Sequence, residues 1–579
     1  MKFITSFILL ILVKTICYSQ SLLQKKVTVQ VVGKPLKLVF KSVEEQGGFY
    51  FSYNSNLIKG DSTVSLHHKN SSVEQLLKTL FGTRFQYKES DKYIAIVPAT
   101  VQQQVWYVSG YVNDFTTGQP ISNATVFERL HLASAMTDEK GYFRLQLREQ
   151  PSVVDINISK ISYADTVIQI SSAASQNISV SITPVSYELD SVVIGSGRIE
   201  SRWLARMLIS SRQQMNSLNL GGFISQQPFQ FSLTPGLGTH GRMGSQVIDR
   251  FSMNIIGGYT AGIDGFELGS IFNIVKQDVR YVQVGGVFNM VGGNVQGVQL
   301  GGAYNQVLGK VKGIQVGGIA NMTLGSMHGI QLGGIYNQSL NAAGIQVAGL
   351  ANINRKGGSG IQLAGIFNYA QKSDGLQIAG LVNSSQQELK GIQIAGVVNQ
   401  TKHLKGLQIG LINIADTSDG YSLGLINIIK RGYHKIAIST TDLHGVNIAF
   451  KTGNERLYSI LIASASLNMN KKSFSAGYGI GSTFHIKPKY SFNPELSTHW
   501  IYAGDIDNTD YVTRAQFQIR YQLSHNVALF AGPAFSFYYH NEKTAVNGYR
   551  QDARNGMPGV DFSNRFKGWI GWSAGLDLF

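Results

Sequence analysis

Few residues in this sequence have the types and spacing needed for catalysis. His67 and His68 are adjacent, and imidazoles can bind a metal ion or transfer protons. They fall in a stretch expected to be a strand, however, where successive side chains point to opposite faces. The glycine pair Gly285-Gly286 recurs along the chain, but no helix N-terminus follows it to hold a phosphate. Since no metalloprotease, nucleophile-elbow or phosphate-loop motif occurs either, the sequence predicts no enzyme, no metal site and no cofactor.

The most regular polar residues are the amides of a repeat that extends from Gly265 to Ile428. Gly-Ile-Gln-Val-Gly-Gly-Ile-Ala-Asn at 313–321 returns as Gly-Ile-Gln-Leu-Gly-Gly-Ile-Tyr-Asn at 329–337. Its glutamines recur every 15 or 16 residues, at Gln283, Gln299, Gln315, Gln331, Gln346, Gln362, Gln377, Gln393 and Gln408. Such amides could bind sugar or line a pore, but stacked structural amides are the commoner use.

Two arrangements are compatible with the alternation of residues within each copy, which is typical of a strand. In the preferred one, each copy is a wall strand of an outer-membrane β-barrel of roughly twenty strands. In the alternative, each copy is one coil of a β-solenoid, in which Asn289, Asn305 and Asn321 stack. The tight turn at Arg431-Gly432 favours the barrel, whereas uniform turn lengths and nearly identical copies favour the solenoid. The copies also resemble the Gly-x-Gln-x-x-Gly-x-x-Asn surface-repeat proteins of Gram-negative envelopes.

After the repeats, the strands are longer and alternate more clearly. Apolar Ala515, Phe517, Ile519, Tyr521 and Leu523 alternate with polar Arg514, Gln516, Gln518, Arg520 and Gln522. Membrane-spanning strands have this pattern, with apolar side chains outward and polar ones inward. The end of the chain, Trp569 to Phe579, resembles an outer-membrane insertion signal, although Phe579 falls on the polar side of the last strand. We therefore expect residues 229–579 to form the barrel.

The composition is that of an exported, mainly β protein. There are 64 glycines and only 15% charged residues, which suits tight turns and closely packed strands. Residues 1–19 have a basic start and a short apolar run, as in a secretory signal peptide. Cleavage after Ser19 removes the only cysteine, Cys17, so the mature chain can form no disulfide. The net charge of +16 would suit anionic lipid, and export argues against nucleic acid as a partner.

Residues 22–98 are expected to form a small α+β domain. Pro35 opens one predicted helix, and the capping box Ser72-Val-Glu-Gln75 opens a second. This order, with SSVEQLLKTLFGTRFQY before YIAIV, resembles the STN domain of secretins and TonB-dependent transducers. The resemblance implies a periplasmic domain that contacts a partner, often an anti-sigma regulator. A folded spacer is the alternative.

Residues 105–185 change to short strands separated by turn residues. The segments 108–126 and 137–147 resemble the carboxypeptidase regulatory-like domain, a seven-stranded β-sandwich without implied peptidase activity. The residues that match its pattern are Asp114, Gly118, Pro120, Ala124, Thr137, Asp138, Gly141 and Phe143.

A short apolar segment follows this sandwich and is the candidate partner-binding site. It resembles the stretch near the TonB box of SusC-like TonB-dependent transporters, and an extended segment can add a strand to a partner's sheet. Its residues are Leu189, Asp190, Val192, Val193 and Ile194. The alternative is a last sandwich strand with a linker. Residues 186–228 are too few for a transporter plug and are expected to hold one short basic amphipathic helix, at a membrane surface or over the barrel mouth.

Together these features predict an outer-membrane β-barrel with two periplasmic modules. We expect it to contact outer-membrane lipid and a periplasmic protein, either TonB or an anti-sigma-type regulator, in signalling or uptake. The alternative is a structural or adhesive surface-repeat protein with no transport role.

Overall fold

The computed structural model describes residues 21–99, 106–147, 152–171, 177–185, 197–468, 470–502, 504, 510–540, 546–550, 552–554 and 556–578. The chain is mainly β, as predicted, and it divides between Trp106 and Tyr107 into two compact units, which are described separately. In the described part of the chain, no helix has the length and hydropathy needed to cross a lipid bilayer.

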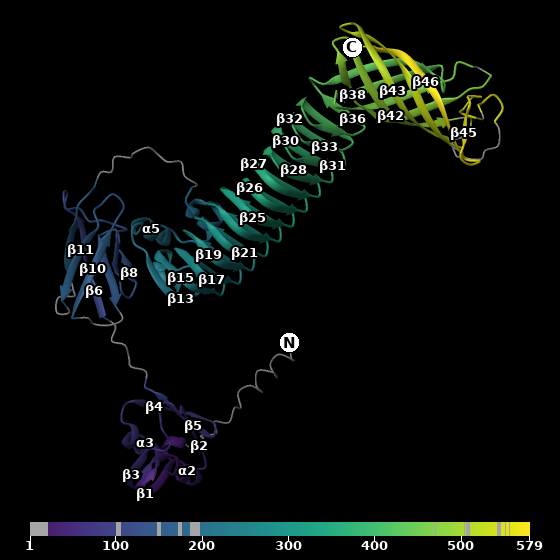
Figure 1. The fold of residues 1–579 in the computed structure, drawn as a ribbon. Coiled ribbons are helices and arrows are strands. Elements are labelled where there is room, and N and C mark those ends of the chain that lie inside the picture. The colour runs from purple at the N-terminus through teal and green to yellow at the C-terminus, as the bar shows by residue number, and fades with distance from the viewer. Residues whose placement is uncertain are drawn as a thin grey trace, which may run out of the picture. The chain divides into compact units, whose positions relative to one another are not determined.

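The first unit is the predicted small α+β fold (Figure 1). Pro35 precedes α2 as expected, and the Ser72 hydroxyl accepts a hydrogen bond from the Gln75 backbone N at 3.3 Å at the start of α3. Val43, Leu76 and Ile94 are fully buried between the helices and the strands. The elements are η1 Leu22–Gln24, β1 Lys26–Pro35, α2 Leu36–Gly47, β2 Tyr50–Tyr53, β3 Thr63–Ser72, α3 Val73–Phe81, β4 Phe85–Ser90 and β5 Tyr93–Pro98, in the sheets β1-β3 and β2-β5-β4.

The second unit opens with a β-sandwich of seven described strands. One sheet has the order β11-β10-β7-β8 and the other β12-β6-β9, with Phe143 and Ile156 buried between them. Asp138 accepts hydrogen bonds from the backbone N of Lys140 and Tyr142, so it closes a turn. The strands are β6 Trp106–Asp114, β7 Thr125–Glu128, β8 Ala133–Met136, β9 Tyr142–Leu147, β10 Val153–Ser159, β11 Thr166–Ser171 and β12 Ile178–Ile182.

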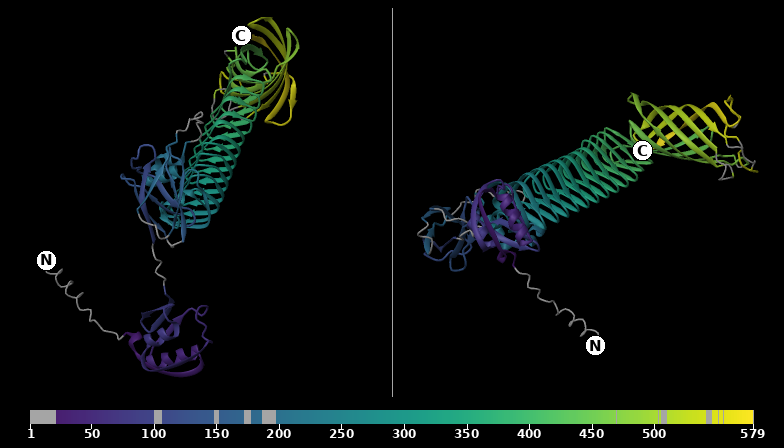
Figure 2. Two further views of the ribbon diagram at one scale, coloured as in Figure 1. Left: turned by 90° about the vertical axis from the view of Figure 1, so that its left-hand side faces the viewer. Right: turned by 90° about the horizontal axis from the view of Figure 1, so that it is seen from below.

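The repeats form a β-solenoid, so the preferred assignment of each copy to a barrel wall strand is wrong and the alternative is correct (Figures 1 and 2). Equivalent strands of successive coils pair in parallel, with Gln315 opposite Gln331 and Asn321 opposite Asn337. A barrel wall would have required antiparallel pairing of adjacent copies. A Cβ on Gly318 would lie 2.1 Å from the Gly302 carbonyl oxygen, so only glycine permits this close stacking of coils.

The solenoid contains 24 described strands. They are β13 Ser225–Thr234, β14 Leu237–Gly238, β15 Val247–Asn254, β16 Gly257–Thr260, β17 Gly262–Gly269, β18 Phe272–Val275, β19 Val279–Gly285, β20 Phe288–Val291, β21 Val295–Gly301, β22 Tyr304–Val307, β23 Val311–Gly317, β24 Ala320–Thr323, β25 Ser326–Gly333, β26 Tyr336–Ala348, β27 Ala351–Ala364, β28 Phe367–Ser373, β29 Leu376–Ala379, β30 Val382–Leu389, β31 Ile392–Ala395, β32 Val398–Leu404, β33 Leu407–Ile409, β34 Ile412–Ser418, β35 Tyr421–Leu423 and β36 Ile426–Ile429.

Two buried amide ladders connect the coils of the solenoid. Along one ladder each glutamine donates to the preceding coil, as when Gln315 Nε2 donates to Gln299 Oε1 at 2.7 Å. Along the other each asparagine donates to the following coil, as when Asn321 Nδ2 donates to Asn337 Oδ1 at 2.9 Å and to the Leu332 carbonyl at 2.6 Å. Because the ladders point in opposite directions, their amide dipoles partly cancel. The amides are therefore structural, and they are not available to a sugar or a pore.

The glutamine ladder ends at a carboxyl group, Glu267. It accepts hydrogen bonds from Gln283 Nε2 at 2.8 Å, Asn254 Nδ2 at 3.1 Å and Ser252 Oγ at 3.3 Å. Full burial raises the pKa of Glu267 to about 7, although these donors act in the opposite direction. A group with a raised carboxyl pKa binds more protons in the folded than in the unfolded chain, so the folded state loses stability as the pH rises from about 4.5 to about 7.

We expect Glu267→Gln to abolish this pH dependence. An amide at position 267 can accept from Gln283 through its oxygen and donate to Ser252 through its nitrogen, so it continues the ladder without a buried charge and loses only the hydrogen bond from Asn254. The urea midpoint of solenoid unfolding, followed by circular dichroism, should fall between pH 5 and pH 8 in the parent by an amount equivalent to roughly 3 kcal/mol and stay nearly constant in the variant. Glu388→Gln, at a surface carboxylate paired with Lys405, should leave the fall in place. Parallel pH profiles of parent and Glu267→Gln would contradict the assignment.

The linker that precedes the solenoid differs from prediction. Instead of one helix at a membrane surface or barrel mouth, it forms a 3-10 turn, η3 Ile199–Ser201, and two helices, α4 Trp203–Leu208 and α5 Ser211–Asn219. Ile199, Ala205 and Ile209 pack against the first coils, because those coils leave a row of apolar side chains to be covered. A further 3-10 segment, η4 Gly241–Gln246, lies between β14 and β15.

Helix α5 connects the sandwich to the solenoid. Its Asn216 Oδ1 accepts a hydrogen bond from Thr125 Oγ1 at 3.0 Å, and its Asn219 Nδ2 donates to the Asn123 carbonyl at 2.7 Å. On the other side, Asn216 Nδ2 donates to the Arg242 carbonyl of η4 at 2.9 Å. These contacts attach the sandwich to the beginning of the solenoid.

A closed β-barrel of eight described strands follows the last coil, in the order β37-β38-β39-β40-β42-β43-β44-β46 with β46 paired to β37. The C-terminal barrel is thus confirmed, but its wall begins at Tyr433 and not at residue 229, because the repeats stack separately. The strands are β37 Tyr433–Thr441, β38 Val446–Asn454, β39 Leu457–Ala465, β40 Phe474–Gly481, β41 Phe484–Lys487, β42 Tyr490–Tyr502, β43 Asp510–Ser524, β44 Val527–Tyr539, β45 Gly559–Asp561 and β46 Phe566–Leu578.

The barrel is apolar outside and polar inside, as the alternation predicted. On β43, Phe517 and Ile519 are 38% and 49% exposed, whereas Arg514 and Gln518 are buried. On β46, Ile570 is exposed and Asp577 is buried. Phe579 lies outside the described residues.

Candidate functional site in the barrel lumen and its mouth

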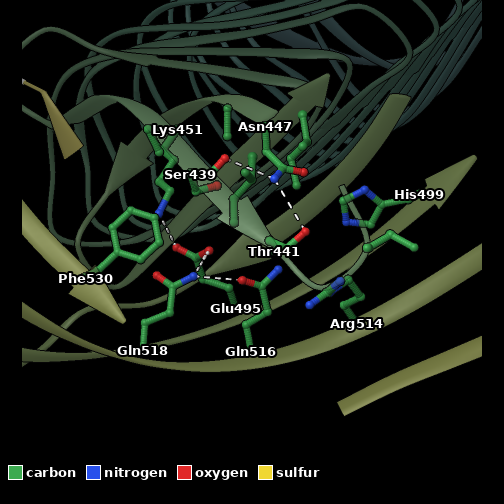
Figure 3. Close-up of a pocket in the computed structure, with 15 residues that line it drawn as sticks. Ser439, Thr441, Asn447, Lys451, Glu495, His499, Arg514, Gln516, Gln518 and Phe530 are labelled. Atoms are coloured by element: carbon green, nitrogen blue, oxygen red, sulfur yellow. Dashed lines mark hydrogen bonds and ion pairs between the residues drawn. The ribbon is translucent and has the colours of Figure 1, made fainter. Parts of the chain in front are cut away.

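Charged residues from four strands meet in the middle of the barrel, and Figure 3 shows two of them, Lys451 and Glu495. Lys451 Nζ of β38 lies 2.6 Å from Glu495 Oε1 of β42 and 3.5 Å from Asp577 Oδ1 of β46. Arg520 Nε of β43 lies 2.9 Å from the other oxygen of Asp577. Two cations therefore balance two carboxylates, and a buried charge in this network has a partner.

Further side chains hold Glu495 in position. Tyr458 Oη donates to Glu495 Oε1 at 2.9 Å, and Gln518 Nε2 donates to Glu495 Oε2 at 3.2 Å. The Lys451 ammonium also lies 5.0 Å from the centre of the Phe530 ring. Both oxygens of this carboxylate thus accept hydrogen bonds from side chains of the barrel.

The end of the barrel away from the solenoid is closed by Asp442, from the hairpin between β37 and β38. Its Oδ1 accepts from Arg514 Nη2 at 2.6 Å and from the Trp572 backbone N at 3.0 Å, and its Oδ2 accepts from Trp569 Nε1 at 2.7 Å. Both members of the ion pair are 1% exposed at their side chains. The hairpin is thus bonded to β43 and β46 across the lumen.

The lumen is consequently filled. The space among Lys451, Glu495, His499 and Arg514 amounts to about 30 Å³, which is room for one or two water molecules. Eight strands give a barrel just wide enough for its own side chains. Among the described residues, the side chains around this space leave no room for a solute larger than water.

A larger cavity lies at the barrel mouth beside the last coil. It measures about 720 Å³ and is basic, with four cationic side chains and one carboxylate. The charged and histidine residues that line it are Arg431, Lys435, Arg456, Arg520, Glu455, His434, His485 and His525. His485 Nε2 lies 3.1 Å from Glu455 Oε2, and Arg520 is paired with Asp577. The cavity can accommodate an anion, and no cluster of metal-ligating residues occurs in the described ranges.

Sequence reasoning identified part of this site. Alternation placed Arg514, Gln518 and Arg520 on the inner side of β43, where the structure has them. It missed Asp442, because that residue lies in a hairpin where alternation carries no information. The candidate partner-binding residues Leu189, Asp190, Val192, Val193 and Ile194 lie outside the described residues, and so does the predicted signal peptide.

The seven-stranded sandwich, with its buried Phe143 and a glycine turn at Gly141, is the part of the chain that a known domain family matches. Residues 108–194 match the CarboxypepD_reg-like domain. The predicted sandwich domain is thereby confirmed, and the match spans a minor part of the chain. Neither a curated protein nor a solved structure matches the chain. The resemblances of residues 22–98 to an STN domain and of the adjoining segment to SusC-like transporters remain predictions.

Proposed function

We propose that this protein is anchored in the outer membrane by its C-terminal barrel and couples the envelope to a periplasmic protein through its N-terminal domains. The observation that carries the proposal is the polarity of the barrel, which exposes apolar side chains and buries charged ones. In water such a surface would be strongly unfavourable, whereas a hydrocarbon layer suits it.

Aromatic residues at both ends of the barrel support a membrane position. Tyr490 and Tyr521 lie side by side at one end, with ring centres 4.9 Å apart, and Trp500 and Tyr511 are partly exposed toward the other. Aromatic girdles of this kind mark the two interfaces of a membrane. The long strands β42, β43, β44 and β46 have 13 to 15 residues each, which is enough to span the hydrocarbon.

The connections indicate which end faces the periplasm. At the end where the solenoid enters, two-residue turns join β38 to β39 and β43 to β44, and residues 482–489 with β41 join β40 to β42. The longest connection, from β44 to β46, lies at the other end. Outer-membrane barrels have short periplasmic turns and longer outer loops. The solenoid, the sandwich and the first unit would then all lie on the periplasmic side of the membrane, which argues against an adhesive role at the cell surface.

Coupling to a partner is better supported than uptake through the barrel. The ion-paired lumen leaves no solute path, while the CarboxypepD_reg-like domain is joined through α5 to a solenoid that ends on the barrel. We propose TonB or an anti-sigma-type regulator as the partner, with Leu189 to Ile194 as its docking segment.

The full-length protein refolded in detergent tests the membrane part of the proposal. We expect a compact band on a gel that shifts on boiling, as closed barrels do, and no conductance steps in a planar bilayer. Solubility without detergent would contradict membrane insertion, and discrete channel openings would contradict a filled lumen.

Photo-crosslinking in cells tests the partner. A photoreactive residue at Val192 should capture TonB or an anti-sigma-type regulator, identified by mass spectrometry, whereas the same residue at exposed Leu130 of the sandwich should not. Equal capture from both positions, or none from Val192, would count against the docking segment.

A further inference from the structure

One edge of the solenoid carries a row of aliphatic side chains, all but one of them exposed, which we name the corner column. Each coil contributes one member, at the bend between its two strands, and the backbone N of Ile335 donates to the Ile319 carbonyl of the coil before it at 2.8 Å. Apart from Ala303, each member is 37–51% exposed. The members are Ile256, Ile271, Val287, Ala303, Ile319, Ile335, Leu350, Ile366, Leu381, Val397, Leu411 and Leu425.

Charged side chains lie at the other connection of many coils. Lys310, Lys356, Lys372 and Lys390 occur there, and Lys405 forms an ion pair with Glu388 at 2.8 Å. The solenoid is therefore amphipathic around its circumference, with an apolar edge and a charged edge. At roughly 4.8 Å per coil the column extends for about 50 Å.

An apolar row of this length indicates a surface that binds something, because soluble monomers rarely expose continuous apolar patches above a few hundred Å². Its composition restricts what the contact can be. The cores of protein interfaces are enriched in Tyr, Trp and Arg, which supply most of the binding energy. The corner column has only Ile, Leu, Val and Ala, which match hydrocarbon and offer nothing more specific.

The column begins at the outer wall of the barrel. Gly424, the neighbour of Leu425, accepts hydrogen bonds through its carbonyl oxygen from Tyr478 Oη at 3.0 Å and from Ser459 Oγ at 2.5 Å. Asn427 Nδ2 donates to the same Ser459 hydroxyl at 2.6 Å, so the asparagine ladder ends on the wall. Tyr478 and Ser459 are on the outward face of β40 and β39, since Tyr478 alternates with inward Gly477 and Gly479 and Ser459 with buried Tyr458. The last coil is thus joined to the outer wall of the barrel at the residue beside Leu425.

We propose that the corner column binds the acyl chains of membrane lipids, so that hydrocarbon contact continues from the barrel wall onto the solenoid. This inference rests on the proposed membrane position of the barrel. A second copy of the chain is the competing occupant, but copies that paired along the whole column would meet the lipid around the barrel at Leu425. Lipid encounters no such obstacle there.

Fluorescence quenching by spin-labelled lipid tests the inference on the full chain. Cys17 is the only cysteine, so Cys17→Ser allows single-cysteine variants to be labelled with an environment-sensitive dye and reconstituted into phosphatidylcholine vesicles with acyl-chain spin labels. Three sites are compared: Ile335→Cys in the corner column, Phe517→Cys on the barrel wall and Lys372→Cys at the charged edge. Heat-modifiable mobility and protease resistance of the solenoid show that each variant is folded.

We expect blue-shifted emission and quenching of several-fold at Phe517→Cys and Ile335→Cys, with little quenching at Lys372→Cys. Quenching at the barrel position alone would overturn the inference while leaving the proposed function intact. An Ile335→Cys protein that is unquenched when labelled and forms disulfide-linked dimers when unlabelled would assign the column to a second copy. Absence of quenching at Phe517→Cys would overturn both the membrane position and the inference.

Discussion

Asp442→Ala is expected to be the most damaging single change in the barrel. It leaves the Arg514 guanidinium buried without its anion and removes the acceptor of Trp569 Nε1 and of the Trp572 backbone N. Breaking one partner of a buried ion pair costs about 3–5 kcal/mol. For a barrel of this size we expect the temperature at which the heat-modifiable band disappears to fall by about 10 °C or more.

A surface ion pair of similar geometry provides the control. Arg554 Nη1 lies 2.8 Å from Asp561 Oδ1, but the Asp561 side chain is 54% exposed, so Asp561→Ala should cost less than about 1 kcal/mol. If Asp442→Ala lowered the melting temperature no more than Asp561→Ala, the Asp442 hairpin would not be locked across the lumen as the structure has it.

Asn321→Leu is expected to have the largest effect in the solenoid. The two side chains have similar size, but leucine cannot donate to Asn337 Oδ1 or to the Leu332 carbonyl, and cannot accept from Asn305 Nδ2. Each buried polar group left without a partner costs about 1–3 kcal/mol, so the total should reach at least about 3 kcal/mol. Since each coil contacts only its neighbours, the damage should remain local.

Hydrogen exchange of the full chain measures this local effect. Amides of β22 to β26 should exchange at least roughly a hundredfold faster in Asn321→Leu, whereas those of the barrel and the sandwich should keep their rates. Gln387→Leu, at an exposed position of the same solenoid, should change little. Unchanged protection of the coils around Asn321, or uniform loss throughout the chain, would contradict a ladder of locally acting amides.

Both predictions concern polar groups buried among strands, Arg514 and Asn321. In both cases the sequence identified the polar residue but not its hydrogen-bond partner. Alternation in the printed sequence put Arg514 on the inner side of its strand, but the acceptor, Asp442, comes from a hairpin far away in the chain. The periodicity exposed the asparagine of every repeat, yet it left open whether Asn321 would face a neighbouring copy or a water-filled lumen.

Several parts of the fold could be predicted because their signals are local. Pro35 and Ser72 mark the starts of two helices in the first unit, and turn residues such as Gly141 separate the strands of the sandwich. The apolar and polar faces of β43 followed from residues two positions apart. The position of the basic helix around Trp203 was predicted wrongly, because Leu204 and Leu208 pack against the first coils of the solenoid while Trp203 and Met207 stay exposed.

By itself the sequence determined the β class, the sandwich, the 16-residue period and the inside-out polarity of the C-terminal strands. Only the tertiary structure decided that the repeats stack in parallel, that the barrel has eight strands with a filled lumen, and that the two meet at Gly424 and Tyr478. The physical reason is that alternation along a strand is the same for parallel and antiparallel neighbours. The choice depends on hydrogen bonds such as Asn321 to Asn337, which form only once distant segments have been brought into register.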